Sequence, residues 1–161
     1  MAYEFAAVTA YIATLSITAN GQEITVNDYD GIRDGADIRQ LPILQPDLSR
    51  PLEFQIVERD SFGPGSMAKQ TLNYSIPYQL LSAPFGKERA VNKNIPAVIE
   101  QVQAIGTVIL HSNEAAFNGD MDIVEDLQLG AGTIGQDAVT DLAGNQFHGA
   151  RLMIMVTEFI N

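Results

Sequence analysis

The chain contains no cysteine and no tryptophan among its 161 residues. Without cysteine it can form neither a disulfide scaffold nor a thiolate metal site. Its uninterrupted apolar runs are all shorter than the roughly 18 residues that a membrane span needs. The first residues also lack the basic region of a secretory signal. We therefore expect neither a membrane span nor a signal peptide.

Charge is scarce as well, and basic charge above all. Charged residues make up 18% of the chain, against about 25% in ordinary globular proteins. Nine lysines and arginines face twenty acids, which gives a net charge of −11 and argues against a conventional nucleic-acid binder. Weakly charged surface that stays soluble often meets another subunit, so we expect an oligomer; a monomer rich in Thr, Gln and Asn is the alternative.

The composition and length indicate one folded domain spanning residues 1–161. Apolar residues make up 46% of the chain, which excludes an intrinsically disordered protein. No internal repeat, low-complexity segment or linker divides the chain.

The first third of the sequence predicts one helix and two short strands. Apolar residues at steps of three and four predict a helix over about residues 3–16; β-prone pairs in this stretch keep a strand as the alternative. A turn at Asn20-Gly21 leads to a strand at 23–26 and a polar loop at 27–40. Residues 41–46 predict an apolar strand with proline at both ends, which suits an edge or a strand terminus.

A strict alternation of apolar and polar residues predicts a long β-hairpin, with strands at 52–58 and 70–80 and an arm over about 51–81. Pro77 has no amide donor, so the late part of the second strand should be unpaired on one side. The tip that joins the two strands is long, and holding it in one conformation costs entropy. We therefore expect it to contact another subunit or a tube. The candidate contact residues are Phe62, Gly63, Pro64, Gly65 and Lys69.

The second half predicts a helix and a central strand. Asn94 can cap a helix that Pro96 opens in its first turn, and Gly106 can end it; residues 107–111 fit a further helical turn or a short strand. Two more strands should follow Asn118-Gly119. Residues 146–160 are apolar on both faces, which predicts a central strand covered by helices or by a neighbouring subunit.

Residues 130–135 match the dinucleotide fingerprint G-x-G-x-x-G, but the chain after them is too short for the helix and second half that such a site requires. The acids of loop 28–37 lack the closing glutamate of a calcium loop, and a solvated acidic edge is favoured for them. His111 and His148 would need a third ligand to bind a metal. We find no nucleophile, base and oxyanion donor in combination, so we expect no enzyme activity, no metal and no cofactor.

The distribution of charge is uneven along the chain. Apart from Arg151, every base lies between positions 33 and 93, whereas residues 94–150 contain eight acids and no base. An acidic stretch repels phosphates, so it could exclude DNA or line a channel through which DNA slides without adhering. Simple solubility is the alternative.

The order of these elements resembles that of the tail-terminator proteins of long-tailed bacteriophages. The similar pieces are the proline-flanked strand Leu41–Pro46, the hairpin strands 52–58 and 70–80, the helix from Asn94, and Phe147–Leu152 running into the last strand. They cover most of the chain as an order of elements. The loops around 27–40 and 57–70 are longer than in the shorter members.

The resemblance implies an α+β fold: a mixed, mainly antiparallel β-sheet with two α-helices packed on one face. It also implies a structural protein of the virion, assembled in the host cytoplasm, that forms a hexameric ring. This ring would cap the tail tube, contact the tail-tube protein and the head-connector or neck protein, and let DNA pass through its lumen. The candidate lumen-lining acids are Asp120, Asp122, Glu125 and Asp126.

Two other functions compete with the tail terminator. One is another head–tail junction or tail-tube structural protein. The other is a small ligand-binding protein with a cleft near Gly130–Gly135.

Overall fold

The computed structural model of the chain describes residues 5–59, 69–85, 91–116, 124–134 and 139–160. In these residues two helices, α1 (Phe5–Ala13) and α2 (Val91–Ala116), accompany one mixed, mainly antiparallel sheet of eight strands. The strands are β1 (Ile17–Ala19), β2 (Gln22–Val26), β3 (Ile43–Pro46), β4 (Glu53–Arg59), β5 (Lys69–Pro84), β6 (Val124–Ile134), β7 (Val139–Thr140) and β8 (Gln146–Ile160). The expected α+β class is confirmed.

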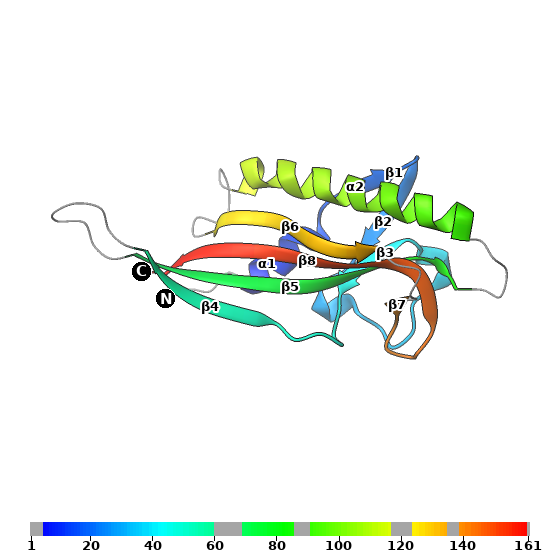
Figure 1. Cartoon of the computed structure of the whole chain (residues 1–161), viewed down its shortest axis with the longest axis horizontal. Coiled ribbons are helices and arrows are strands. Elements are labelled where there is room, and N and C mark those ends of the chain that lie inside the picture. The colour runs from blue at the N-terminus through cyan, green and yellow to red at the C-terminus, as the bar shows by residue number, and fades with distance from the viewer. Residues whose placement is uncertain (1–4, 60–68, 86–90, 117–123, 135–138, 161) are drawn as a thin grey trace.

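The sheet follows the order β1-β2-β3-β5-β8-β6, with β4 paired to β5 and β7 paired to β8. The pair β2–β3 is parallel and the other pairs are antiparallel. Figure 1 shows the long strands β4, β5, β8 and β6 side by side, with α2 lying along the sheet. The predicted hairpin is β4–β5, and the predicted central strand is β8, which lies between β5 and β6.

Both helices pack on one face of the sheet, which we call the helix face. Alternate residues of β5 and β8 point into the same core as the apolar stripe of each helix. Val8 and Ile12 of α1 are buried in it, as are Ile105 and Ile109 of α2. The sheet contributes Leu72, Tyr74, Ile76, Tyr78, Leu80, Ala150, Leu152, Ile154 and Val156. One continuous core therefore lies between the sheet and the two helices.

The opposite face of the sheet is covered at one end only. There a second, small core joins Ile43, Leu81, Val139 and Phe147 under the partly buried Ala36 and Leu41. Towards the other end of the long strands the side chains of this face are partly buried or exposed, and Met155 is 42% exposed. We call this part the open face; its described residues are Glu53, Gln55, Asn73, Ser75, Met153, Met155 and Thr157.

The structure corrects two expectations about the second helix and decides one open alternative. It begins at Val91, so Asn94 is not its cap, and it runs through Gly106 to Ala116, so residues 107–111 are helical. A glycine inside a helix costs about 1 kcal/mol relative to alanine. That cost is outweighed because Ile105 and Ile109, on either side of the glycine, are buried against the sheet.

The strands follow the sequence more closely. Asn20 and Gly21 have φ of 52° and 75°, as a tight hairpin turn requires, but this turn joins β2 to strand β1, which we did not expect. Strand β3 lies inside the sheet rather than at an edge, and Pro46 is its last residue. The two helices cover only one face of β8, so its second apolar row is not covered by helices.

Pro77 lies where one side of β5 changes partner. Strand β3 pairs with β5 as far as Tyr78, and β4 begins to pair at Ser75. Between them the chain leaves the sheet, and the Asp47 amide donates to the Pro77 carbonyl at 2.8 Å. The prediction that the late part of this strand is unpaired on one side is wrong, because residues 78–81 pair with β3 on one side and with β8 on the other. Within residues 69–81, only Ile76 and Pro77 have no ladder partner on the side of β3 and β4.

Candidate functional site

The residues that the sequence put forward as functional lie mostly outside the described part of the chain. Asp120 and Asp122 do so entirely, as do Phe62, Gly63, Pro64 and Gly65. Lys69 begins β5 and Glu125 and Asp126 belong to β6, but their side chains are also outside what the structure describes. In the ladder Asp126 is opposite Thr157, and the register shifts at Glu125, where the alternation of the sequence breaks.

The acids of loop 27–40 have local structural roles. Asp28 Oδ1 accepts from the Gly31 amide at 3.1 Å, and Asp37 caps a short 3₁₀ turn through the Arg39 amide at 3.0 Å. The Arg39 guanidinium also pairs with Asp37 at 3.2 Å and lowers the pKa of that carboxyl. Within the described ranges, no group of three or more His, Asp or Glu side chains could hold a metal ion.

The other sequence candidates are likewise part of the fold. His148 is buried and its ring lies 4.8 Å from that of Phe85, centroid to centroid, whereas the side chain of His111 is outside the described residues. Gly130 and Gly132 lie within strand β6 rather than at a strand-to-helix turn. No helix among the described residues is long and apolar enough to cross a membrane.

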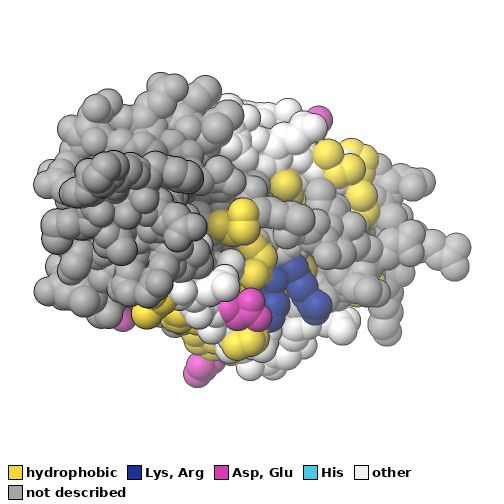
Figure 2. All heavy atoms as spheres, turned by 60° about the vertical axis from the view of Figure 1, so that its left-hand side comes forward, with side chains coloured by type: hydrophobic (Ala, Val, Ile, Leu, Met, Phe, Trp, Pro, Cys, Tyr) yellow, Lys and Arg dark blue, Asp and Glu magenta, His cyan; other side chains and the backbone are white. Residues whose placement is uncertain are grey.

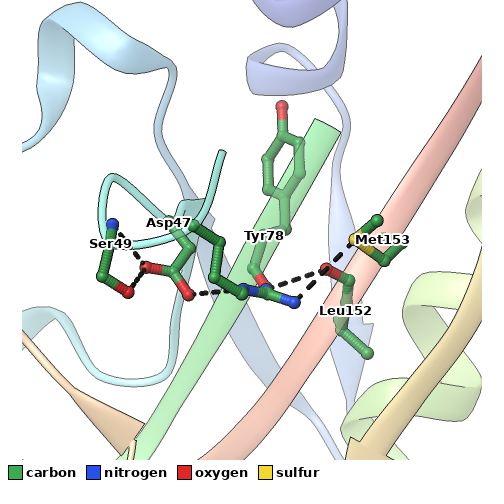
Figure 3. A network of polar contacts seen from close by, with 6 residues as sticks. Asp47, Ser49, Tyr78, Leu152 and Met153 are labelled. Atoms are coloured by element: carbon green, nitrogen blue, oxygen red, sulfur yellow. Dashed lines mark hydrogen bonds and ion pairs between the residues drawn. The ribbon is translucent and has the colours of Figure 1, made fainter. Parts of the chain in front are cut away.

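A buried polar network, which the sequence analysis missed, holds the crossing from β3 to β4 (Figure 3). Arg50 Nε donates to Asp47 Oδ2 at 2.7 Å, and its Nη2 donates to the backbone carbonyls of Tyr78 and Leu152. Arg50 Nη1 lies 3.8 Å from the sulfur of Met153. The guanidinium thus spans β5 and β8 on the side of the sheet away from the helices.

Asp47 is the counter-charge of this network. Its Oδ1 accepts from the amide of Ser49 at 3.0 Å and from its hydroxyl at 2.6 Å. Burial by itself would raise the pKa of Asp47, but the hydrogen bonds from Ser49 and Arg50 outweigh it and hold that pKa below 3.8. The run Asp47-Leu48-Ser49 carries the signal of an Asx turn, which could have indicated this role.

The described surface has two hollows, and the second of them adjoins this network. One has a volume of about 200 Å³ and includes Asn27, Arg33 and Gln45 in its lining; the other, of about 270 Å³, includes Asp47, Asp141 and Arg151. The carboxylate of Asp141 accepts from the amides of Ala36 and Asn145, at 3.0 and 2.9 Å. Both carboxylates in the second hollow are therefore occupied by donors of the chain itself, and neither is poised as a catalytic base.

The described surface is more distinctive along strand β4. Leu52, Phe54 and Ile56 are 36%, 51% and 61% exposed. Strand β4 pairs with β5 on one side, and no described residue pairs with its other side. Figure 2, in which the left-hand side of Figure 1 comes forward, shows hydrophobic side chains at the surface on both sides of a basic group, with acidic side chains beside it. Apolar side chains and an unpaired strand edge thus occur together.

Comparison with known proteins adds no identity: no family model matches the chain, and no curated protein matches it.

Proposed function

We propose that this protein is a structural subunit of a ring in a bacteriophage virion, similar to the tail terminators that cap the tail tube and join it to the head connector. The observation that carries the proposal is the open face of the sheet. The strands of the sheet are long, and two helices cover its helix face. On the open face, the rest of the described chain leaves the middle part uncovered. Such a subunit can form a ring wall, with the helices outside and the open face towards the lumen.

The chemistry of the open face suits the wall of a DNA channel. Its rows are Glu53–Ser75–Met155 and Gln55–Asn73–Thr157, with Met153 opposite Pro77. These seven residues include one acid and no base, and the two arginines nearest to them are Arg50, which is paired with Asp47, and Arg151 at the end of the face. Lysine and arginine bind phosphates by releasing counterions, so the middle of this face, which has neither, would hold DNA weakly. The net charge of −11 also weakens binding to DNA.

The order of elements supports the same proposal. The helix, the β-hairpin, the second helix and the closing strand are all present and in the order on which the resemblance rests. In the ring we assign the lumen to the open face together with the acids Asp120, Asp122, Glu125 and Asp126. The hairpin tip, Phe62–Gly65 with Lys69, would contact a neighbour or the tail tube.

A tail-tube protein is the second candidate, because a tube subunit would need the same open face. A ligand-binding protein is less well supported, since both hollows are smaller than the roughly 300–1,000 Å³ of typical ligand pockets.

Electron microscopy of the purified protein tests the proposal. We expect six-fold rings in negative stain, a matching mass by light scattering, and no measurable affinity for duplex DNA at ordinary salt. Long polymers would assign the chain to the tube instead. A chain that stays monomeric at high concentration, and monomeric in the particle from which it is isolated, would overturn the proposal.

A further inference from the structure

The rows of side chains that cross the sheet lose their cover abruptly at strand β4. In one row on the helix face, Val156, Tyr74 and Phe54 are opposite one another and are 1%, 3% and 51% exposed. In the next row the corresponding values for Glu158, Leu72 and Ile56 are 1%, 7% and 61%. The buried layer therefore continues onto β4, where the described residues cover it only in part.

Aromatic packing anchors the inner part of this layer. The ring of Phe54 lies 5.2 Å from that of Tyr74 and 6.0 Å from that of Phe5 in α1, centroid to centroid. Phe54 is thus held in one orientation by its own chain while half of its surface stays exposed. An ordered, exposed aromatic residue costs little entropy when it binds a partner.

Strand β4 carries charged residues towards its ends, at Glu53, Glu58 and Arg59, but its middle lacks the features that keep strand edges from pairing. Between Glu53 and Val57 it has no proline and no lysine, and its described side chains are all exposed. Edges of monomeric sheets are commonly blocked by such residues, by bulges or by a covering loop. The ladder between β4 and β5 runs without a shift from Glu53 to Arg59, so the outer backbone groups are regularly spaced.

A second strand edge without a described partner lies on the opposite side of the sheet, and its strand runs in the direction that pairing with β4 requires. Strand β6 pairs with β8, and no described strand pairs with its outer side. Since β4–β5, β5–β8 and β8–β6 are all antiparallel, β4 runs antiparallel to β6. Copies placed side by side in the same orientation would bring β4 of one against β6 of the next as an ordinary antiparallel pair.

We infer that the outer edge of β4 pairs with the outer edge of β6 in a second copy of this chain, with Phe54 and Ile56 buried at the junction. This inference rests on the proposed ring and names the contact that builds it. The contact joins two different surfaces, so it repeats from copy to copy and closes into a ring when the rotation allows. It extends the sheet from subunit to subunit and leaves the open faces on one side.

A charge placed at the edge tests the contact, with a matched control one residue away. Ile56→Lys adds a charge on the apolar row, whereas Gln55→Lys adds the same charge on the open face of the same strand. Both positions are exposed, so both variants should fold. We expect Ile56→Lys to raise the concentration needed for assembly at least tenfold in sedimentation velocity, and Gln55→Lys to change it less than threefold.

Cross-linking identifies the two strands, because the chain has no cysteine of its own. We expect a disulfide between subunits when Gln55→Cys and Gln128→Cys proteins are mixed, and little in either protein alone. A disulfide that forms in Gln55→Cys alone would show β4–β4 pairing and overturn the inference. Rings that remain intact in Ile56→Lys would also overturn the inferred β4–β6 contact, but not the proposed ring. A wild-type chain that never assembles would overturn both the contact and the ring.

Discussion

Arg50 and Asp47 form an ion pair of 2.7 Å on the side of the sheet away from the helices, where the chain crosses from β3 to β4. The side chain of Asp47 is 4% exposed and that of Arg50 is 26% exposed. Arg50 also bonds the carbonyls of Tyr78 and Leu152, so one side chain ties the crossing to the two central strands. The position of β4, and with it the proposed ring contact, depends on this pair.

Removing the guanidinium should therefore destabilise the fold. Arg50→Met leaves the buried Asp47 carboxylate with only Ser49 as its donor, and we expect a loss of about 2–3 kcal/mol in the free energy of unfolding. Urea denaturation followed by circular dichroism measures it. Arg39→Met, at an ion pair whose arginine is 90% exposed, should change stability by less than about 0.5 kcal/mol. Equal losses in the two variants would contradict the role of Arg50.

Stability should fall in acid because of Asp47 and Asp141. Burial alone would raise the pKa of each carboxyl, but hydrogen bonds from their neighbours leave both below 3.8. A carboxyl with a lowered pKa in the folded state stabilises the fold above its unfolded pKa of about 4, and loses this contribution as the pH falls through the folded value. Wild type should thus lose stability steadily between about pH 5 and pH 2.

The variant Asp47→Asn separates this contribution from general acid effects. It should be less stable than wild type at pH 6, and the difference should narrow as the pH is lowered, because protonation removes the same charge from wild type. Denaturant titrations at a series of pH values measure the difference. Asp34→Asn, at an exposed position of loop 27–40, should follow wild type throughout. A constant difference for Asp47→Asn would refute the linkage.

Gly149 should tolerate no side chain. A Cβ there would lie 1.8 Å from the carbonyl oxygen of Leu80 on the neighbouring strand, and backbone cannot move aside as a flexible side chain can. We expect Gly149→Ala to cost about 3 kcal/mol or more, or to prevent folding. Thermal unfolding measures the loss. Gly35→Ala is the matched control, because its nearest contact would be 3.9 Å away and it should be nearly neutral.

The two faces of β8 should respond differently to the same charge. Ile154 is fully buried on the helix face, and Met155 is 42% exposed on the open face. We expect Ile154→Asp to abolish cooperative folding, because a carboxylate there cannot be solvated. Met155→Asp should remain folded with a loss below about 1 kcal/mol. A folded, soluble Ile154→Asp protein would contradict the assignment of the core.

The sequence predicted the elements whose signals are local. The alternation of residues 52–58 and 70–80 identified the β4–β5 hairpin, and Asn20-Gly21 identified the tight turn before β2. Both signals are local, because side-chain period and backbone conformation are properties of a few consecutive residues. The Asn94 cap and the Gly106 end were wrong for the opposite reason. A local preference of about 1 kcal/mol at Gly106 was overridden by the burial of Ile105 and Ile109, which depends on strands distant in the chain.

What the sequence alone determined was the class of the protein: weakly charged, acidic, free of cysteine, and built from two helices and long alternating strands. What only the tertiary structure decided was which apolar surfaces remain exposed. The row of Phe54 and Ile56 looks in the sequence like any buried row, but in the fold both side chains are more than half exposed. Likewise, Arg50 bonds Asp47, Tyr78 and Leu152 only because three segments pack together. No periodic pattern in the sequence predicts these contacts.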